Sequence, residues 1–69
     1  MREFKDVILD LRKEQQLTQL QVATGVGLNY RTIAAYENGR REPDIATIKK
    51  LCKFFKCTSD YLLGINNFE

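Results

Sequence analysis

The turn at residues 27–29 constrains the fold more than any other feature of the sequence. Gly27 suits the left-handed conformation that ends a helix, and Asn29 is a good N-cap for the next helix, so only Leu28 separates the two. Helices joined by so short a turn cannot lie comfortably antiparallel. We therefore expect the helices on either side of this turn to cross at a steep angle.

The rest of the chain shows the 3.6-residue period of amphipathic helices, and no segment shows the alternation of a strand. The sequence predicts an all-α fold class, a compact five-helix bundle forming a single domain over residues 1–69. The expected helices are one ending near Gln15 or Gln16, one beginning at a capping box of Thr18 and Gln21, one over about Tyr30–Asn38, one after an N-cap at Asp44, and a short one from Thr58 to before Gly64.

Apolar side chains recur on one side of each expected helix and predict the core. Residues 29–56 also hold seven lysines and arginines against three acidic residues, a net +4, whereas residues 1–28 sum to zero. Such a bias is weak evidence for a polyanionic partner, since a lysine-rich helix face is most often solvated. The predicted core positions are Phe4, Val7, Ile8 and Leu11, then Leu20, Val22, Ala23 and Val26, then Ile33 and Tyr36, then Ile45, Ile48, Leu51, Cys52 and Phe55, then Leu62 and Leu63.

Gly25 lies in the last turn of the expected second helix. Glycine there destabilises a helix by about 1 kcal/mol relative to alanine. The sequence leaves two explanations open, which are early fraying of the helix and a close backbone contact.

Several function classes are excluded by composition. The chain has no histidine, no serine or cysteine nucleophile beside a base and no glycine-rich phosphate loop, so we expect no enzyme, cofactor, metal site or small-molecule substrate. Cys52 and Cys57 are interpreted as small buried hydrophobes rather than a disulfide. No apolar run is long enough to span a membrane and no signal peptide opens the chain, which predicts a cytoplasmic protein.

The expected third helix has two unlike sides. Ile33 and Tyr36 anchor it in the core, and Glu37 shares their side. Because an unpaired buried carboxylate is costly, Glu37 needs a partner, and Arg12 is the obvious one. The opposite side, with two alanines in its middle, carries Arg31, Ala34, Ala35 and Asn38.

Four motifs occur in order: LTQLQVA at 17–23, GLNYRTIAAYENG at 27–39, REP at 41–43 and TSDYLLG at 58–64. With them the chain resembles the phage repressor and Cro-like (XRE-type) helix-turn-helix proteins over roughly residues 4–64. The resemblance implies a helix-turn-helix at about residues 18–39, with its second helix in the major groove of double-stranded DNA. It further implies a small transcriptional regulator of a bacterium or phage, associated with the nucleoid. Such a protein is expected to repress by binding a palindromic operator as a homodimer.

The resemblance also assigns roles to individual residues. It implies base contacts by Tyr30, Arg31 and Ala35, phosphate contacts by Gln19, Asn38 and Arg40, and an ion pair of Arg12 with Glu37 that joins the first helix to the third.

Beyond the resemblance, the bare alanines have a physical interpretation. Ala34 and Ala35 would let the helix sit deep in the groove while Arg31, with Asn29 beside it, reads bases. The family more often carries polar or long side chains at these two positions, and alanine is also simply a good helix former. Arg41 follows Arg40 in the loop where phosphates would pass.

Two further questions stay open in the sequence. Ile65 and Phe68, in the tail at residues 65–69, either fold back on the domain or join Cys57, Thr58 and Tyr61 in a dimer interface. The alternative function is a protein-binding module, with the alanine face docking on an antitoxin-like or anti-repressor-like partner. A salt titration of DNA binding discriminates the two, because binding to phosphates weakens steeply as salt rises.

Overall fold

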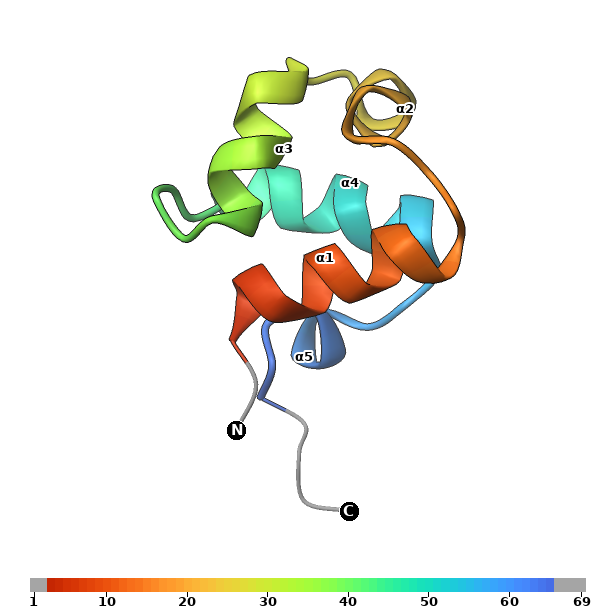
Figure 1. The fold of residues 1–69 in the computed structure, drawn as a ribbon. Helices are drawn as coiled ribbons and strands as arrows, with labels where there is room; N and C mark the ends of the chain where they lie inside the picture. The colour runs from red at the N-terminus through yellow and green to blue at the C-terminus, as the bar shows by residue number, and fades with distance from the viewer. Residues whose placement is uncertain (1–2, 66–69) are drawn as a thin grey trace.

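A computed structural model describes residues 3–65 of the chain. Over these residues the structure is all-helical, in agreement with the predicted fold class. Figure 1 shows α1 and α4 crossing the middle of the view, α2 and α3 above them, and α5 below α1. The helices are α1 (Phe4–Glu14), α2 (Gln19–Val26), α3 (Tyr30–Glu37), α4 (Ile45–Phe55) and α5 (Ser59–Leu62).

Side-chain caps begin four of the five helices of residues 3–65, and three of these caps are at the residues that the sequence predicts. Thr18 Oγ1 accepts from the Gln21 amide at 3.0 Å while Gln21 Oε1 accepts from the Thr18 amide at 2.8 Å, completing the capping box. Asn29 caps α3, Asp44 caps α4 and Thr58 caps α5, each through a side-chain oxygen. These local bonds fix the helix starts independently of tertiary packing.

The turn between α2 and α3 has the expected conformation. Gly27 adopts φ 76°, in the left-handed region, and its amide donates to the carbonyl of Ala23. In Figure 1, α2 is seen nearly end-on while α3 runs across the view, so the two helices cross steeply. The first helix ends at Glu14, slightly earlier than expected, because Gln16 takes φ 57° and turns the chain away.

The core contains most of the apolar side chains that the periodicity indicates. Its largest fully buried members are Ile8, Ile33, Leu51, Leu62, Val7 and Val22. Cys52, predicted to be buried, is half-buried, and so is Cys57.

Leu20 and Ile45 were wrongly predicted to face the core. Leu20 is 61% exposed and Ile45 is 72% exposed. At 100° per residue Leu20 points roughly 110° away from the side of α2 that buries Val22, Ala23 and Val26. Ile45 is the first residue of α4 and lies at the end of the helix, outside the packed region.

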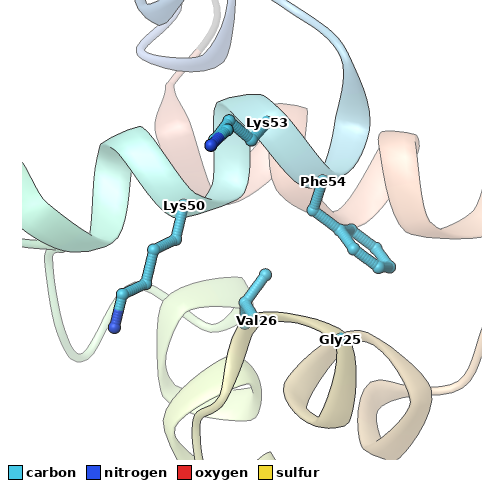
Figure 2. A pocket seen from close by; sticks show the side chains of 5 residues that line it. All are labelled: Gly25, Val26, Lys50, Lys53 and Phe54. Atoms are coloured by element: carbon cyan, nitrogen blue, oxygen red, sulfur yellow. The ribbon is translucent and has the colours of Figure 1, made fainter.

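Gly25 packs tightly against a side chain of α4, which decides between its two explanations. The helix α2 continues through Val26, and a Cβ atom added to Gly25 would overlap the aromatic ring of Phe54. Figure 2 shows this ring extending from α4 toward Gly25, beside Val26. Gly25 therefore permits a close approach of α2 to α4. The atoms that come close to it belong to the Phe54 side chain, whereas the sequence offered a contact with backbone.

Candidate nucleic-acid interface

The side chains that α3 buries in the core fix the orientation of its outward side. Ile33 is fully buried and Tyr36 nearly so, and the Tyr36 ring meets the ring of Phe4 edge-to-face at a centroid distance of 5.4 Å. This anchoring leaves Arg31 exposed, with Ala34 and Ala35 half-buried on the flank. On its outward side, the middle of α3 thus presents the methyl groups of Ala34 and Ala35, which lie close to the helix backbone.

At the N-terminal end of α3, the side chains of residues 29–31 interact. Asn29 Oδ1 accepts from the Arg31 amide at 2.8 Å, which leaves both hydrogens of the Asn29 amide nitrogen for a ligand. The guanidinium carbon of Arg31 lies 5.9 Å from the centroid of the Tyr30 ring, within cation–π range. The ring therefore limits the conformations of the Arg31 side chain.

Beneath α3, Arg12 and Glu37 form a two-pronged ion pair. Arg12 Nε donates to Glu37 Oε2 at 2.6 Å and Arg12 Nη2 donates to Glu37 Oε1 at 3.0 Å. A third donor of the same guanidinium, Nη1, reaches the carbonyl of Leu17 at 2.9 Å. The hydrogen bonds that Arg12 donates to Glu37 raise the pKa of Arg12 above its ordinary value, against the effect of burial. The pair links α1 to the C-terminal end of α3 across the segment that precedes α2.

Gln19 joins this ion pair, which the sequence does not indicate. Its Nε2 donates to Glu37 Oε1 at 3.0 Å, bringing the first residue of α2 to the same carboxylate. An amide nitrogen carries two hydrogens, so one remains for a phosphate, as the resemblance implies for this position. No local signal could predict the bond, because 18 residues separate Gln19 from Glu37.

The loop after α3 is ordered by its own hydrogen bonds. Asn38 Oδ1 accepts from the Arg40 amide at 3.0 Å, and the same amide donates to the carbonyl of Ala35 at 3.0 Å. Asn38, Arg40 and Arg41 are all exposed. Two guanidinium groups and the Asn38 amide nitrogen are therefore available to an anionic ligand at this end of α3.

The predicted self-association residues lie apart from α3. Tyr61 and Ile65 are exposed at and beyond α5, while the Thr58 hydroxyl accepts from the Tyr61 amide at 3.1 Å. Burial, together with the adjacent Cys52 thiol, raises the pKa of Cys57 to about 11. Phe68 lies outside the described residues, so the structure does not test its predicted role.

A separate hollow of about 300 Å³ lies between the C-terminal end of α2 and the middle of α4. Its lining contains none of the residues that the sequence predicts for DNA or dimer contacts: Gly25, Val26, Lys50, Lys53 and Phe54. In Figure 2 Lys50 and Phe54 extend from α4 on either side of Val26. The lysines are exposed, in line with the expectation that most cations of α4 are solvated.

Within residues 3–65, no group of three or more acidic or cysteine side chains is gathered in a way that could hold a metal ion. Nor does any helix of this part of the chain combine the length and apolar character needed to cross a lipid bilayer.

A family model described as helix-turn-helix matches residues 8–62, most of the chain. The chain belongs to the helix-turn-helix family. This confirms the resemblance to phage repressor and Cro-like proteins.

Three similar proteins place the domain among regulators. Over 52 residues it is 44% identical to the cryptic phage CTXphi transcriptional repressor RstR of Vibrio cholerae, covering 75% of this chain and 47% of that protein. It is 34% identical over 62 residues to the transcriptional activator BcrR of Enterococcus faecalis, covering 90% of this chain and 30% of that protein. The P22 c2 repressor, solved in complex with a synthetic operator, superposes with a TM-score of 0.89 at 26% identity, covering 96% of this chain and 100% of that one.

The chain spans about half the length of RstR and less than a third of BcrR. All three relatives are named as regulators of transcription, and the family is not one of enzymes, in agreement with the prediction that the domain is not an enzyme.

Proposed function

We propose that this helix-turn-helix domain binds double-stranded DNA sequence-specifically, with α3 in the major groove and α2 across the sugar-phosphate backbone. The observation that carries the proposal is the outward side of α3, where an exposed Arg31 stands beside two alanines. A helix fits in the major groove only if its outer side chains do not hold its backbone off the bases.

Arg31 is the principal base reader in this proposal. Arginine is the usual bidentate partner of guanine O6 and N7, and the Tyr30 ring holds the Arg31 guanidinium near the start of α3. Ala35 offers a methyl group to a thymine methyl, and the free amide nitrogen of Asn29 can donate to a base acceptor. With so few hydrogen-bonding side chains, part of the specificity comes from DNA shape and deformability.

Phosphate contacts flank the base readers. Gln19 lies at the N-terminus of α2, where backbone N–H groups and the helix dipole favour an anion. Asn38, Arg40 and Arg41 lie in the loop beyond the other end of α3. The Arg12–Glu37 pair fixes the rotation of α3 between these two ends, so that Arg31 faces the bases.

The domain is proposed to act as a repressor that occludes a promoter, bound as a dimer to a palindromic operator. The names of RstR and the P22 c2 protein support repression, whereas BcrR is named as an activator. The dimer is supported by the exposed apolar side chains of Tyr61 and Ile65.

Selection of binding sites from random duplexes tests the proposal. The unaltered protein should enrich one motif, with affinity that falls steeply as salt rises. Arg31→Ala should lose about 5- to 150-fold discrimination at one guanine, corresponding to roughly 1–3 kcal/mol. Lys13→Ala, an exposed cation at the end of α1, is the matched control and should select the same motif as the unaltered protein.

Two results would overturn the assignment. If Arg31→Ala selects the same motif with equal stringency, then α3 does not read bases as proposed. If the unaltered protein enriches no duplex and its partner binding is insensitive to salt, the protein-binding alternative is favoured instead.

A further inference from the structure

The first turn of α1 lies against the loop that follows α3. The side-chain stem of Lys5 runs along Gly39: Lys5 Cδ is 3.2 Å and Cε 4.0 Å from the place that a Cβ on Gly39 would occupy. Gly39 has φ 80°, so the absence of a side chain there serves both the turn and the close approach of the lysine. The lysine is thus directed along the loop.

Lys5 and Arg41 border the same small hollow. This hollow, of about 60 Å³, lies between the start of α1 and the loop, and both cations are among its lining residues. Lys5 is exposed, and among residues 3–65 the structure gives its ammonium no carboxylate partner. A cation that is exposed, lacks an ion-pair partner and is held beside Arg41 is available to an external anion.

We propose that Lys5 binds a DNA phosphate, so that the phosphate-binding surface of the loop at residues 38–41 extends onto α1. The inference rests on the proposed function, since it concerns the same duplex. The Lys5 stem lies close against the loop where residue 39 is glycine, and this flexible stem places a point charge without fixing a base. Its contribution is therefore to affinity and salt dependence, and not to sequence choice.

Glu3 and Glu42 also line this hollow and oppose the effect of the two cations. Their carboxylates repel a passing phosphate, which weakens binding without removing a contact. Removing the charge of Lys5 should therefore weaken DNA binding, whereas removing the charge of Glu42 should strengthen it. The proposal thus predicts the direction of both effects.

The test measures affinity for the selected duplex against salt concentration. Each phosphate neutralised contributes about −0.9 to the slope of log affinity against log salt, so Lys5→Gln should make the slope shallower by about 0.9. The same term corresponds to an affinity loss of roughly fivefold at 0.15 M salt. Glu42→Gln should instead tighten binding, and Lys13→Gln, an exposed lysine at the opposite end of α1, should leave the slope unchanged.

Melting curves of each variant, recorded alongside, should match that of the unaltered protein, since Lys5 is exposed. A slope for Lys5→Gln equal to that of the unaltered protein overturns the Lys5 contact while leaving DNA binding intact. An equal shift from Lys13→Gln also overturns it, because the effect would then be one of net charge. If the unaltered protein binds no duplex, the proposed function fails, and the Lys5 contact fails with it.

Discussion

Glu37 connects three separate segments of the chain through one carboxylate. Its side chain is only 6% exposed, and its two oxygens accept from Arg12 and from Gln19. Breaking a buried pair by removing one partner costs far more than the pair itself contributes, because the remaining charge is left without compensation. The side chain of Arg12 is 15% exposed, so it would regain little hydration in return.

Glu37→Gln should therefore lower the free energy of unfolding by about 2–4 kcal/mol, somewhat below the loss for a fully buried pair. Urea denaturation at neutral pH measures this difference. Glu14→Gln removes an exposed carboxylate from α1 and should change stability by less than about 0.5 kcal/mol. Equal stability of both variants would show that the pair is no stronger than a surface ion pair, and would remove the proposed orientation of α3 with it.

The two cysteines are brought together by the end of α4. Lys56 takes φ 58°, and the Cys57 amide donates to the carbonyl of Cys52 at 3.1 Å, which is the bond of a Schellman motif. In this motif the two residues so paired also contact through their side chains. The pKa of Cys57 is raised to about 11, mainly because the thiol is partly buried and to a smaller extent because the Cys52 thiol is adjacent.

Alkylation of Cys57 by iodoacetamide should accordingly be slow in the folded protein. The thiolate is the reactive form, so at pH 8 the rate should be about a hundredfold below that in urea and should rise until the pH approaches 11. Because the folded pKa is raised, the stability that the neutral thiol contributes is fully present below the unfolded pKa of about 9 and is lost as the pH rises toward 11.

Trypsin separates the two cysteines, since it cleaves after Lys53 and Lys56, and peptide masses then report each thiol independently. The same rate for Cys57 in the folded protein and in urea would contradict the raised pKa.

Prediction from sequence succeeded for residues whose roles are local. Thr18, Asn29 and Asp44 cap the helices they precede, as predicted, because a cap depends only on the next three residues. The bond from Gln19 to Glu37 could not be predicted in this way, because it depends on how α2 and α3 cross.

At the scale of the elements, α2 packs against α4 where Gly25 meets the ring of Phe54. The Phe54 ring occupies the space where a side chain at residue 25 would lie, and it meets the Phe55 ring edge-to-face at 5.0 Å. In an open helix, replacing glycine by alanine stabilises by about 0.5–1 kcal/mol. Here the added methyl must displace an aromatic ring.

Gly25→Ala should thus lower stability in the unaltered background and raise it by about 0.5–1 kcal/mol in a Phe54→Ala background, where the space is vacant. Thermal or urea unfolding of the four proteins of this cycle gives both values. A gain of the same size in both backgrounds would show that the ring moves aside freely and that Gly25 has no packing role.

The sequence predicted where the helices lie better than how their surfaces meet. Apolar period and caps located all five helices, yet Leu20 and Ile45 were assigned to the core and are exposed. Period alone cannot tell an apolar residue on the edge of a helix from one in the middle of its buried side. The outward side of α3 was predictable because Ile33 and Tyr36, both buried, mark the opposite side of the helix as the one that faces the core.

At the scale of the whole molecule, the proposed function gives one domain of this size a single helix, α3, to place in the major groove. A helix in the major groove reads only a few base pairs, and dimers of the motif read two half-sites about 10–10.5 base pairs apart. Ile65 is 55% exposed just beyond α5, and Figure 1 shows α5 below α1, away from α3. It is therefore a position at which the proposed pairing of two copies can be altered without altering the DNA contacts.

Ile65→Asp should weaken binding to a palindromic duplex by at least about tenfold while leaving binding to a duplex with one half-site unchanged. The reason is that pairing turns the second half-site contact into an intramolecular event, which raises avidity without a new DNA contact. Fluorescence anisotropy with both duplexes measures the two affinities, and sedimentation of the protein alone reports its association state. Equal losses on both duplexes would assign Ile65 to folding or to DNA contact, and no loss on either would move the interface elsewhere on the domain.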